Sequence, residues 1–152
     1  VRIGFNSRLY TIQAAILLEK LSIFQEELDA RNMVAEYYTR FLHEKVKVPQ
    51  VPEQYKSSWA QYTIKVSDRD GLANSLAAQN IPTAIYYATC MHIQTAFGYL
   101  GYKEGSFPSA EMMSSTVLSL PMHPYLSQID QDFIIDSINN FYNNPSKIPV
   151  FR

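Results

Sequence analysis

Residues 59–80 read WAQYTIKVSDRDGLANSLAAQN and join a strand pattern to a helix pattern. In the first eight of these residues, aromatic and β-branched side chains alternate with others, which is typical of a strand. Ser67 and Asp68 then offer a side-chain oxygen that can cap a helix over residues 69–79. Asn80 tolerates the left-handed conformation in which helices often end. The sequence therefore predicts a strand followed by a helix.

A long helix is predicted before this unit, over residues 11–44. Apolar residues recur there at steps of three and four, with Arg31 in the one missing position, which is the spacing of one helical stripe. No Pro or Gly interrupts the stripe, which consists of Leu17, Leu21, Phe24, Leu28, Ala35, Tyr38 and Leu42. A helix of this length can span the join between two domains or pack on a single sheet, and periodicity leaves both readings open.

The remainder of the chain is predicted to alternate between strands and helices. Ser127 followed by Asp130 resembles a capping box at the start of the last helix. The connections allow antiparallel strand pairs, so a doubly wound sheet is not inferred. The fold class is therefore α/β, a small sheet with packed helices after the long helix. The predicted strands cover residues 83–87 and 116–121, with a turn or short strand at 46–48. The predicted helices cover residues 109–115 and 128–142, with a short helix or turn at 91–100.

Composition argues against several classes of function. With 13 Lys and Arg against 14 Asp and Glu, the net charge is -1, so no basic excess can neutralise a nucleic-acid backbone. No stretch approaches the roughly 18 apolar residues of a membrane span, and no membrane partner is expected. The single cysteine, Cys90, suits a reducing compartment, so we expect a cytoplasmic protein. The chain begins without Met and without a signal-peptide pattern, and we expect it to be a fragment of a longer chain.

Motifs that carry chemistry on their own are few. His43, His92 and His123 lack the spacing of zinc ligands, so no metal is expected. The sequence has no phosphate-binding loop, no dinucleotide fingerprint and no serine nucleophile elbow. Cys90 is more simply read as a small, partly buried thiol than as a nucleophile.

Two groups of polar loop residues remain as candidates for ligand binding. Asn6 and Arg8 precede the long helix, where an amide and a guanidinium can hold a phosphate or a carboxylate. The alternative is that Asn6 or Ser7 merely caps that helix.

The second group follows the strand predicted at residues 83–87. Tyr86, His92 and Gln94 combine an aromatic face with hydrogen-bonding groups, and such a set can line a ligand cleft. The alternative places one of the two neighbouring tyrosines, Tyr86 and Tyr87, in the core and the other at the surface.

Five blocks of sequence resemble the DegT/DnrJ/StrS group of nucleotide-sugar aminotransferases. They occur in the order of that family and cover nearly all of the chain. The blocks are GFNSRL (4–9) running into TIQAAIL (11–17), WAQY (59–62), RDGL (69–72), IPTAIYY (81–87) and VLSLPMHP (117–124). The resemblance implies the fold-type I architecture of enzymes that use pyridoxal 5'-phosphate (PLP). It assigns residues 1–44 to the end of the large domain and the long linking helix, and residues 45–152 to the small C-terminal α/β domain.

The resemblance also assigns roles to particular residues. Asn6 matches the asparagine that reaches the neighbouring subunit's site and hydrogen-bonds the PLP phosphate, and Arg8 matches a nearby arginine. Tyr86, His92 and Gln94 match the segment that approaches the nucleotide sugar. A homodimer with PLP, a nucleotide-sugar substrate and an amino-acid donor is therefore expected for the full-length protein.

The implied reaction is a transamination in which an amino group, usually from L-glutamate, reaches a keto group on a nucleotide-linked sugar. Such reactions serve the biosynthesis of cell-surface polysaccharides or antibiotic sugars. No lysine of this chain matches the family's Schiff-base lysine, so the segment alone is predicted to be inactive. The alternatives are a stand-alone, non-catalytic α/β binding or dimerisation module, and a PLP-binding regulator or dehydratase in which another residue replaces the lysine.

Overall fold

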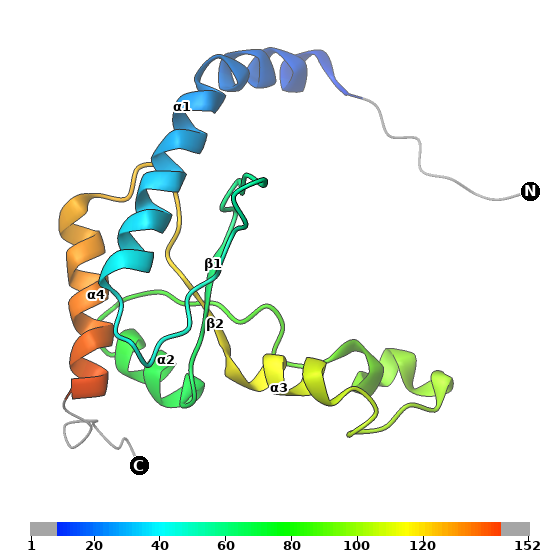
Figure 1. The fold of residues 1–152 in the computed structure, drawn as a ribbon. Coiled ribbons are helices and arrows are strands. Elements are labelled where there is room, and N and C mark those ends of the chain that lie inside the picture. The colour runs from blue at the N-terminus through cyan, green and yellow to red at the C-terminus, as the bar shows by residue number, and fades with distance from the viewer. Residues whose placement is uncertain (1–8, 144–152) are drawn as a thin grey trace, which may run out of the picture.

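Two antiparallel strands, β1 (Tyr62–Lys65) and β2 (Val117–Leu120), lie at the centre of the fold in a computed structural model that describes residues 9–143 (Figure 1). The register pairs Tyr62 with Leu120 and Lys65 with Val117. Single-residue bridges extend this sheet on its two sides, Lys47 to Lys65 and Ala84 to Ser119. The helices are α1 (Thr11–Phe41), α2 (Arg69–Ala77), α3 (Pro108–Thr116) and α4 (Gln128–Asn143), with two 3-10 helices, η1 (Met91–Ile93) and η2 (Thr95–Leu100).

The prediction of a strand at residues 83–87 is wrong, because only Ala84 of this segment pairs with the sheet, in a single bridge. The Ala84 N–H donates to the Ser119 carbonyl at 3.1 Å, and the Ser119 N–H donates back at 2.8 Å. On one side of this bridge Pro82 has no N–H to donate. On the other side the chain turns at Tyr86 and leaves the sheet. The pairing therefore ends after one residue.

The strand predicted from Trp59 begins later, at Tyr62, because Trp59 is not extended. Its φ angle is 46°, in the left-handed region that bulky residues rarely adopt. The Trp59 indole N–H donates to Asn32 Oδ1 at 2.9 Å, and the Trp59 carbonyl accepts from Arg31 Nη1 at 3.0 Å. Both partners lie on α1, so contacts with the long helix hold Trp59 out of the strand.

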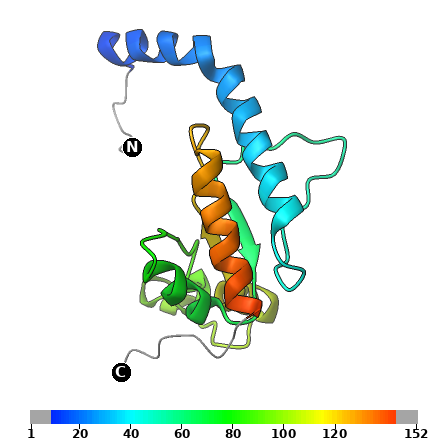
Figure 2. The same cartoon turned by 90° about the vertical axis from the view of Figure 1, so that its left-hand side faces the viewer.

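One hydrophobic core joins the C-terminal half of α1 to both strands, α2 and α4. Figure 2 shows α4 lying alongside this half of α1 and in front of the strands. Burying each large apolar side chain contributes about 1.5–3 kcal/mol, so this cluster dominates the stability of the described fold. The assignment of residues 1–44 and 45–152 to different domains stays a prediction. The largest fully buried side chains are Tyr38, Tyr62, Ile64, Leu72, Leu76, Leu118 and Ile138.

Several predicted helix ends are confirmed by their capping contacts. Asp68 caps α2, since its Oδ1 accepts from the Gly71 N–H at 3.0 Å. Asn80 follows α2 with a φ angle of 60°, as a left-handed stop. At α4, Ser127 Oγ accepts from the Asp130 N–H at 3.1 Å and donates to the Asp130 carboxylate at 2.5 Å. These caps are local in sequence, which is why the sequence alone can predict them.

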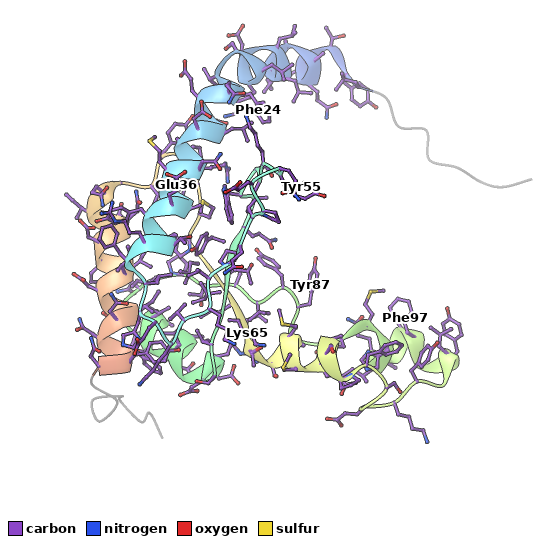
Figure 3. The ribbon with its side chains drawn as sticks, in the orientation of Figure 1. Phe24, Glu36, Tyr55, Lys65, Tyr87 and Phe97 are labelled. Atoms are coloured by element: carbon purple, nitrogen blue, oxygen red, sulfur yellow. The ribbon has the colours of Figure 1, made fainter. Side chains whose placement is uncertain are left out.

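The apolar stripe of α1 is buried along only part of its length. Ala35 and Tyr38 are in the core, whereas Leu17, Leu21 and Phe24 are 49%, 64% and 51% exposed. Figure 1 shows this N-terminal half of α1 extending beyond the rest of the described fold, and Figure 3 shows Phe24 upon it. The helix ends at Phe41, three residues before the predicted end.

Residues 86–116, called the arm below, leave the sheet on the side away from α4. The arm comprises η1, η2 and α3, and α3 runs directly into β2. Figure 3 shows Tyr87 near the start of the arm and Phe97 toward its far end. No helix among residues 9–143 has both the length and the apolar character needed to cross a membrane.

Candidate functional site

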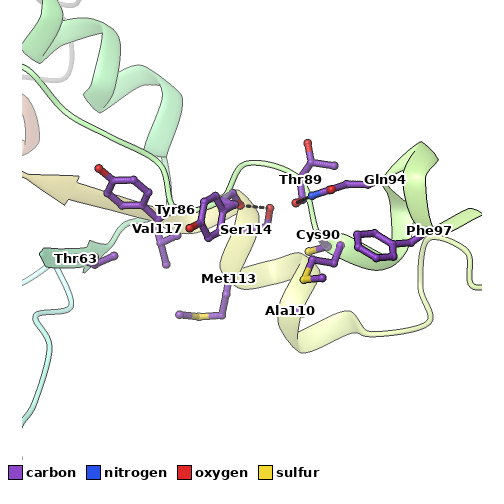
Figure 4. A pocket seen from close by; sticks show the side chains of 12 residues that line it. Thr63, Tyr86, Thr89, Cys90, Gln94, Phe97, Ala110, Met113, Ser114 and Val117 are labelled. Atoms are coloured by element: carbon purple, nitrogen blue, oxygen red, sulfur yellow. Dashed lines mark hydrogen bonds between the residues drawn. The ribbon is translucent and has the colours of Figure 1, made fainter. Parts of the chain in front are cut away.

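A pocket of about 700 Å³ lies between the arm and the edge of the sheet (Figure 4). Its volume falls within the range of small-molecule sites, and its lining is mostly apolar with a few polar groups. The pocket brings together two residues predicted as substrate-binding, Tyr86 and Gln94. Its other walls come from β1, β2, η2 and α3, through residues that include Thr63, Val117, Phe97 and Met113.

Tyr86 is not a core residue, which answers the alternative reading of that position. Tyr86 and Tyr87 are both exposed, at 46% and 76%, and their rings meet edge to face at 5.8 Å. The Tyr87 carbonyl accepts a hydrogen bond of 2.8 Å from Ser114 Oγ, drawn in Figure 4. This bond joins the tyrosine pair to α3, so the aromatic wall of the pocket is anchored to the helix that leads into the sheet.

Gln94 lies between η1 and η2, in extended backbone conformation. Its Nε2 donates to the Thr89 carbonyl at 3.2 Å, and Thr89 also lines the pocket. The amide is therefore held against the pocket wall. An amide offers both an acceptor and donors, which suits recognition of sugar hydroxyls.

His92 is placed differently from the other two predicted residues, because it does not line this pocket. Its side chain is 9% exposed, and Nε2 lies 2.8 Å from Glu111 Oε1. A carboxylate only accepts, so Nε2 carries the proton and donates. The ring also meets the Phe107 ring edge to face at 4.9 Å. Direct contact between His92 and a substrate stays a prediction.

Glu111, the partner of His92, is a residue that the sequence analysis missed. Its carboxylate also accepts from the Gly105 N–H, at 3.0 and 2.9 Å to the two oxygens, and from the Phe107 N–H at 3.1 Å. These backbone donors, together with His92, hold the pKa of Glu111 below its ordinary value. Gly105 has a φ angle of 88°, a conformation that glycine adopts without strain. The sequence did offer one indication of this residue, because Glu111 lies in the first turn of the helix predicted at residues 109–115, where an acidic side chain is favoured.

The predicted cofactor-binding residues Asn6 and Arg8 lie outside the described residues, and their roles stay predictions. The alternative role, capping of the long helix by Asn6 or Ser7, also falls on residues outside the described part of the chain. α1 begins at Thr11 with Tyr10 in the N-cap position. The Tyr10 N–H donates to Gln13 Oε1 at 3.2 Å, so the first turn is closed by the helix itself.

The described part of the chain does not contain a cluster of side chains that could bind a metal ion. Among residues 9–143, no group of three or more His, Cys, Asp or Glu side chains lies close enough to hold a metal ion. Cys90 is a free, partly buried thiol on the wall of the pocket.

Comparison with known proteins places this geometry in a family. Residues 1–139 match the DegT/DnrJ/EryC1/StrS aminotransferase family. A solved DegT/DnrJ/EryC1/StrS aminotransferase from Brucella abortus is 51% identical, with a TM-score of 0.84 over 93% of this chain and 38% of that chain. The two share a fold, and the chain corresponds to the C-terminal part of such enzymes, as predicted.

Two curated relatives of similar sequence have names that indicate different functions. The UDP-2-acetamido-2-deoxy-3-oxo-D-glucuronate aminotransferase of Pseudomonas aeruginosa is 37% identical over 92% of this chain and 38% of its own length. A pleiotropic regulatory protein of Geobacillus stearothermophilus is 38% identical over 93% of this chain and 39% of its own length. The chain thus spans less than half of the length of these relatives. It belongs to the DegT/DnrJ/EryC1/StrS aminotransferase family.

Proposed function

We propose that this chain is the C-terminal part of a PLP-dependent aminotransferase that acts on a nucleotide-linked keto sugar, with L-glutamate as the amino donor. The observation that carries the proposal is the arm pocket, with Tyr86 and Gln94 on its walls, in a chain of this family. The Pseudomonas relative is named for a nucleotide-linked 3-oxo sugar, which supports the substrate class. The proposed setting is the cytoplasmic synthesis of sugars for cell-surface polysaccharides or antibiotics.

The residues of the pocket have the chemistry that this substrate needs. A sugar ring presents apolar faces and a rim of hydroxyls. The Tyr86 ring supplies a flat apolar surface together with a hydroxyl, and Gln94 supplies an amide that both donates and accepts. Apolar neighbours such as Phe97 and Met113 reduce the water around the sugar and strengthen those hydrogen bonds. His92 is proposed to serve the same site.

The proposed cofactor contacts lie at the N-terminus of the chain. The amide of Asn6 and the guanidinium of Arg8 are donors that fit a phosphate, and we propose that they hold the PLP phosphate across a homodimer interface. When bound, PLP supplies the electron sink and carries the amino group between the two substrates. The chain alone is expected to be inactive, because none of its lysines matches the family's Schiff-base lysine.

A second candidate function is non-catalytic binding or regulation on the same scaffold. The observation that favours it is the similarity to the Geobacillus protein, which is named as a pleiotropic regulatory protein. This candidate predicts ligand binding without transfer of an amino group.

The experiment uses the full-length protein that contains this chain. The purified protein is loaded with PLP and incubated first with L-glutamate alone, and formation of 2-oxoglutarate is measured. Nucleotide-linked 3-keto sugars, with UDP and with dTDP, are then supplied, and mass spectrometry detects the aminated product. The proposal expects turnover in both steps. Binding of a nucleotide sugar with no turnover in either step would contradict it and favour the second candidate.

A further inference from the structure

Within the arm, residues 87–92 are fastened to α3 at two points that lie one helical turn apart. Ser114 Oγ donates to the Tyr87 carbonyl at 2.8 Å, close to the sheet. Farther out, the Glu111 carboxylate accepts from His92 Nε2 at 2.8 Å. The first contact fixes the tyrosine pair, and the second fixes η1, which ends next to Gln94. Two opposite walls of the pocket are therefore hydrogen-bonded to the same short helix, α3.

Glu111 is the centre of the outer fastening. Its two oxygens accept from three N–H groups, which belong to His92, Gly105 and Phe107. These donors come from η1, from the loop after η2 and from the N-terminus of α3. The His92 ring fills the remaining space by packing on Phe107, whose own ring meets Tyr102 at 5.1 Å. One carboxylate thus joins three segments, and the ring contact between His92 and Phe107 supports the same junction.

The contact depends on the carboxylate rather than on the size of the side chain. All three partners donate, so an ionised carboxylate, which only accepts, satisfies each of them. A glutamine at this position has the same shape and loses the negative charge that attracts all three donors, and its NH₂ group at the place of Oε2 faces the Gly105 N–H. Backbone hydrogen bonds from Gly105 and Phe107 lower the pKa of Glu111, which keeps it ionised at neutral pH.

We propose that Glu111 is a positioning residue: it holds His92, and through η1 the Gln94 side of the pocket, at the separation from α3 that admits the nucleotide-linked sugar. The inference rests on the proposed aminotransferase function. Glu111 need not touch the substrate, because it acts on the pocket through its three N–H partners. The glutamate half-reaction does not involve the nucleotide, so it should not depend on this separation.

The test compares Glu111→Gln with Glu104→Gln in the full-length, PLP-loaded protein. Glu104 is an exposed residue of the same arm and provides a matched change of charge. For Glu111→Gln we expect the KM for the nucleotide-linked keto sugar to rise about tenfold, the size of one lost charge-assisted hydrogen bond. The rate of 2-oxoglutarate formation from L-glutamate should stay within about twofold of wild type. Glu104→Gln should match wild type in both measurements.

Hydrogen exchange on the same proteins gives a readout that does not require turnover. In Glu111→Gln we expect faster amide exchange confined to residues 91–107, with β1, β2 and α4 unchanged. An unchanged KM, unchanged exchange in the arm, or an equal fall of both half-reactions would overturn the inference while leaving the proposed function intact. A wild-type protein that aminates no nucleotide sugar would instead overturn the proposed function and the positioning role together.

Discussion

The hydroxyl of Tyr38 makes a hydrogen bond inside the core. It donates to the Pro121 carbonyl at 3.0 Å, and no part of the Tyr38 side chain is exposed. Tyr38→Phe keeps the ring packing but leaves the carbonyl without this donor, so we expect the free energy of unfolding to fall by about 1–3 kcal/mol. Urea denaturation measures the change. Tyr37→Phe is the control, because the Tyr37 hydroxyl bonds Asp132 at the surface and its loss should cost less; equal losses would contradict the prediction.

The buried hydroxyl of Tyr62 should make the free energy of unfolding depend on alkaline pH. Burial raises its pKa from 10.0 to about 12, whereas the unfolded chain keeps the ordinary value. The folded state therefore holds the phenolic proton more tightly. This contribution to stability is complete below pH 10 and is lost as the pH rises toward about 12. Urea midpoints across this range should fall less steeply for Tyr62→Phe than for wild type, and identical slopes would count against the assignment.

At the scale of elements, the serine cap of α4 gives the next prediction. Ser127 Oγ bonds the backbone and the carboxylate of Asp130, so Ser127→Ala removes both contacts. We expect a loss of about 0.5–2 kcal/mol in the free energy of unfolding, because α4 packs on the core. Thermal unfolding measures it. Ser109→Ala, an exposed serine in the first turn of α3, should have little effect, and a similar loss there would refute the capping argument.

Helices were predicted more accurately than strands, for a physical reason. The limits of α2 and α4 depend on Asp68, Asn80 and Ser127, whose capping contacts reach only a few residues along the chain. Strands depend on partners distant in sequence. The residues around Ala84 have strand-like composition but find one pairing position, and hydrogen bonds to α1 take Trp59 out of β1.

The candidate site shows the same division. Tyr86 and Gln94 lie eight residues apart in the sequence, which is close enough for their shared pocket to be anticipated. The contact between His92 and Glu111 spans 19 residues, and nothing in the sequence around either residue specifies the other. Asn6 and Arg8 lie outside the described residues, so their roles rest on the resemblance to the family alone.

At the scale of the whole molecule, Asn6 is proposed to bind the PLP phosphate across the dimer interface, so PLP affinity tests this role. Asn6→Ala in the full-length protein should weaken PLP retention by about 1–3 kcal/mol, the cost of a hydrogen bond to a charged group. Absorbance titration with PLP measures the affinity. Asn74→Ala, an exposed change on α2, is the control and should leave it unaltered. PLP affinity equal to wild type in Asn6→Ala would remove the phosphate role.

Because α1 is buried along only part of its length, the free energy of local opening differs between its two halves. Around Ala35 and Tyr38, opening the helix requires the core to open, so its free energy approaches that of global unfolding. Around Leu17 and Leu21, backbone hydrogen bonds, local propensity and surface contacts such as the Lys20–Glu27 ion pair resist opening, and a short helix without core packing is marginal in water. One continuous helix therefore contains a gradient of opening free energies. Whatever covers the apolar side chains of its first turns would set how far the rigid part of the helix extends.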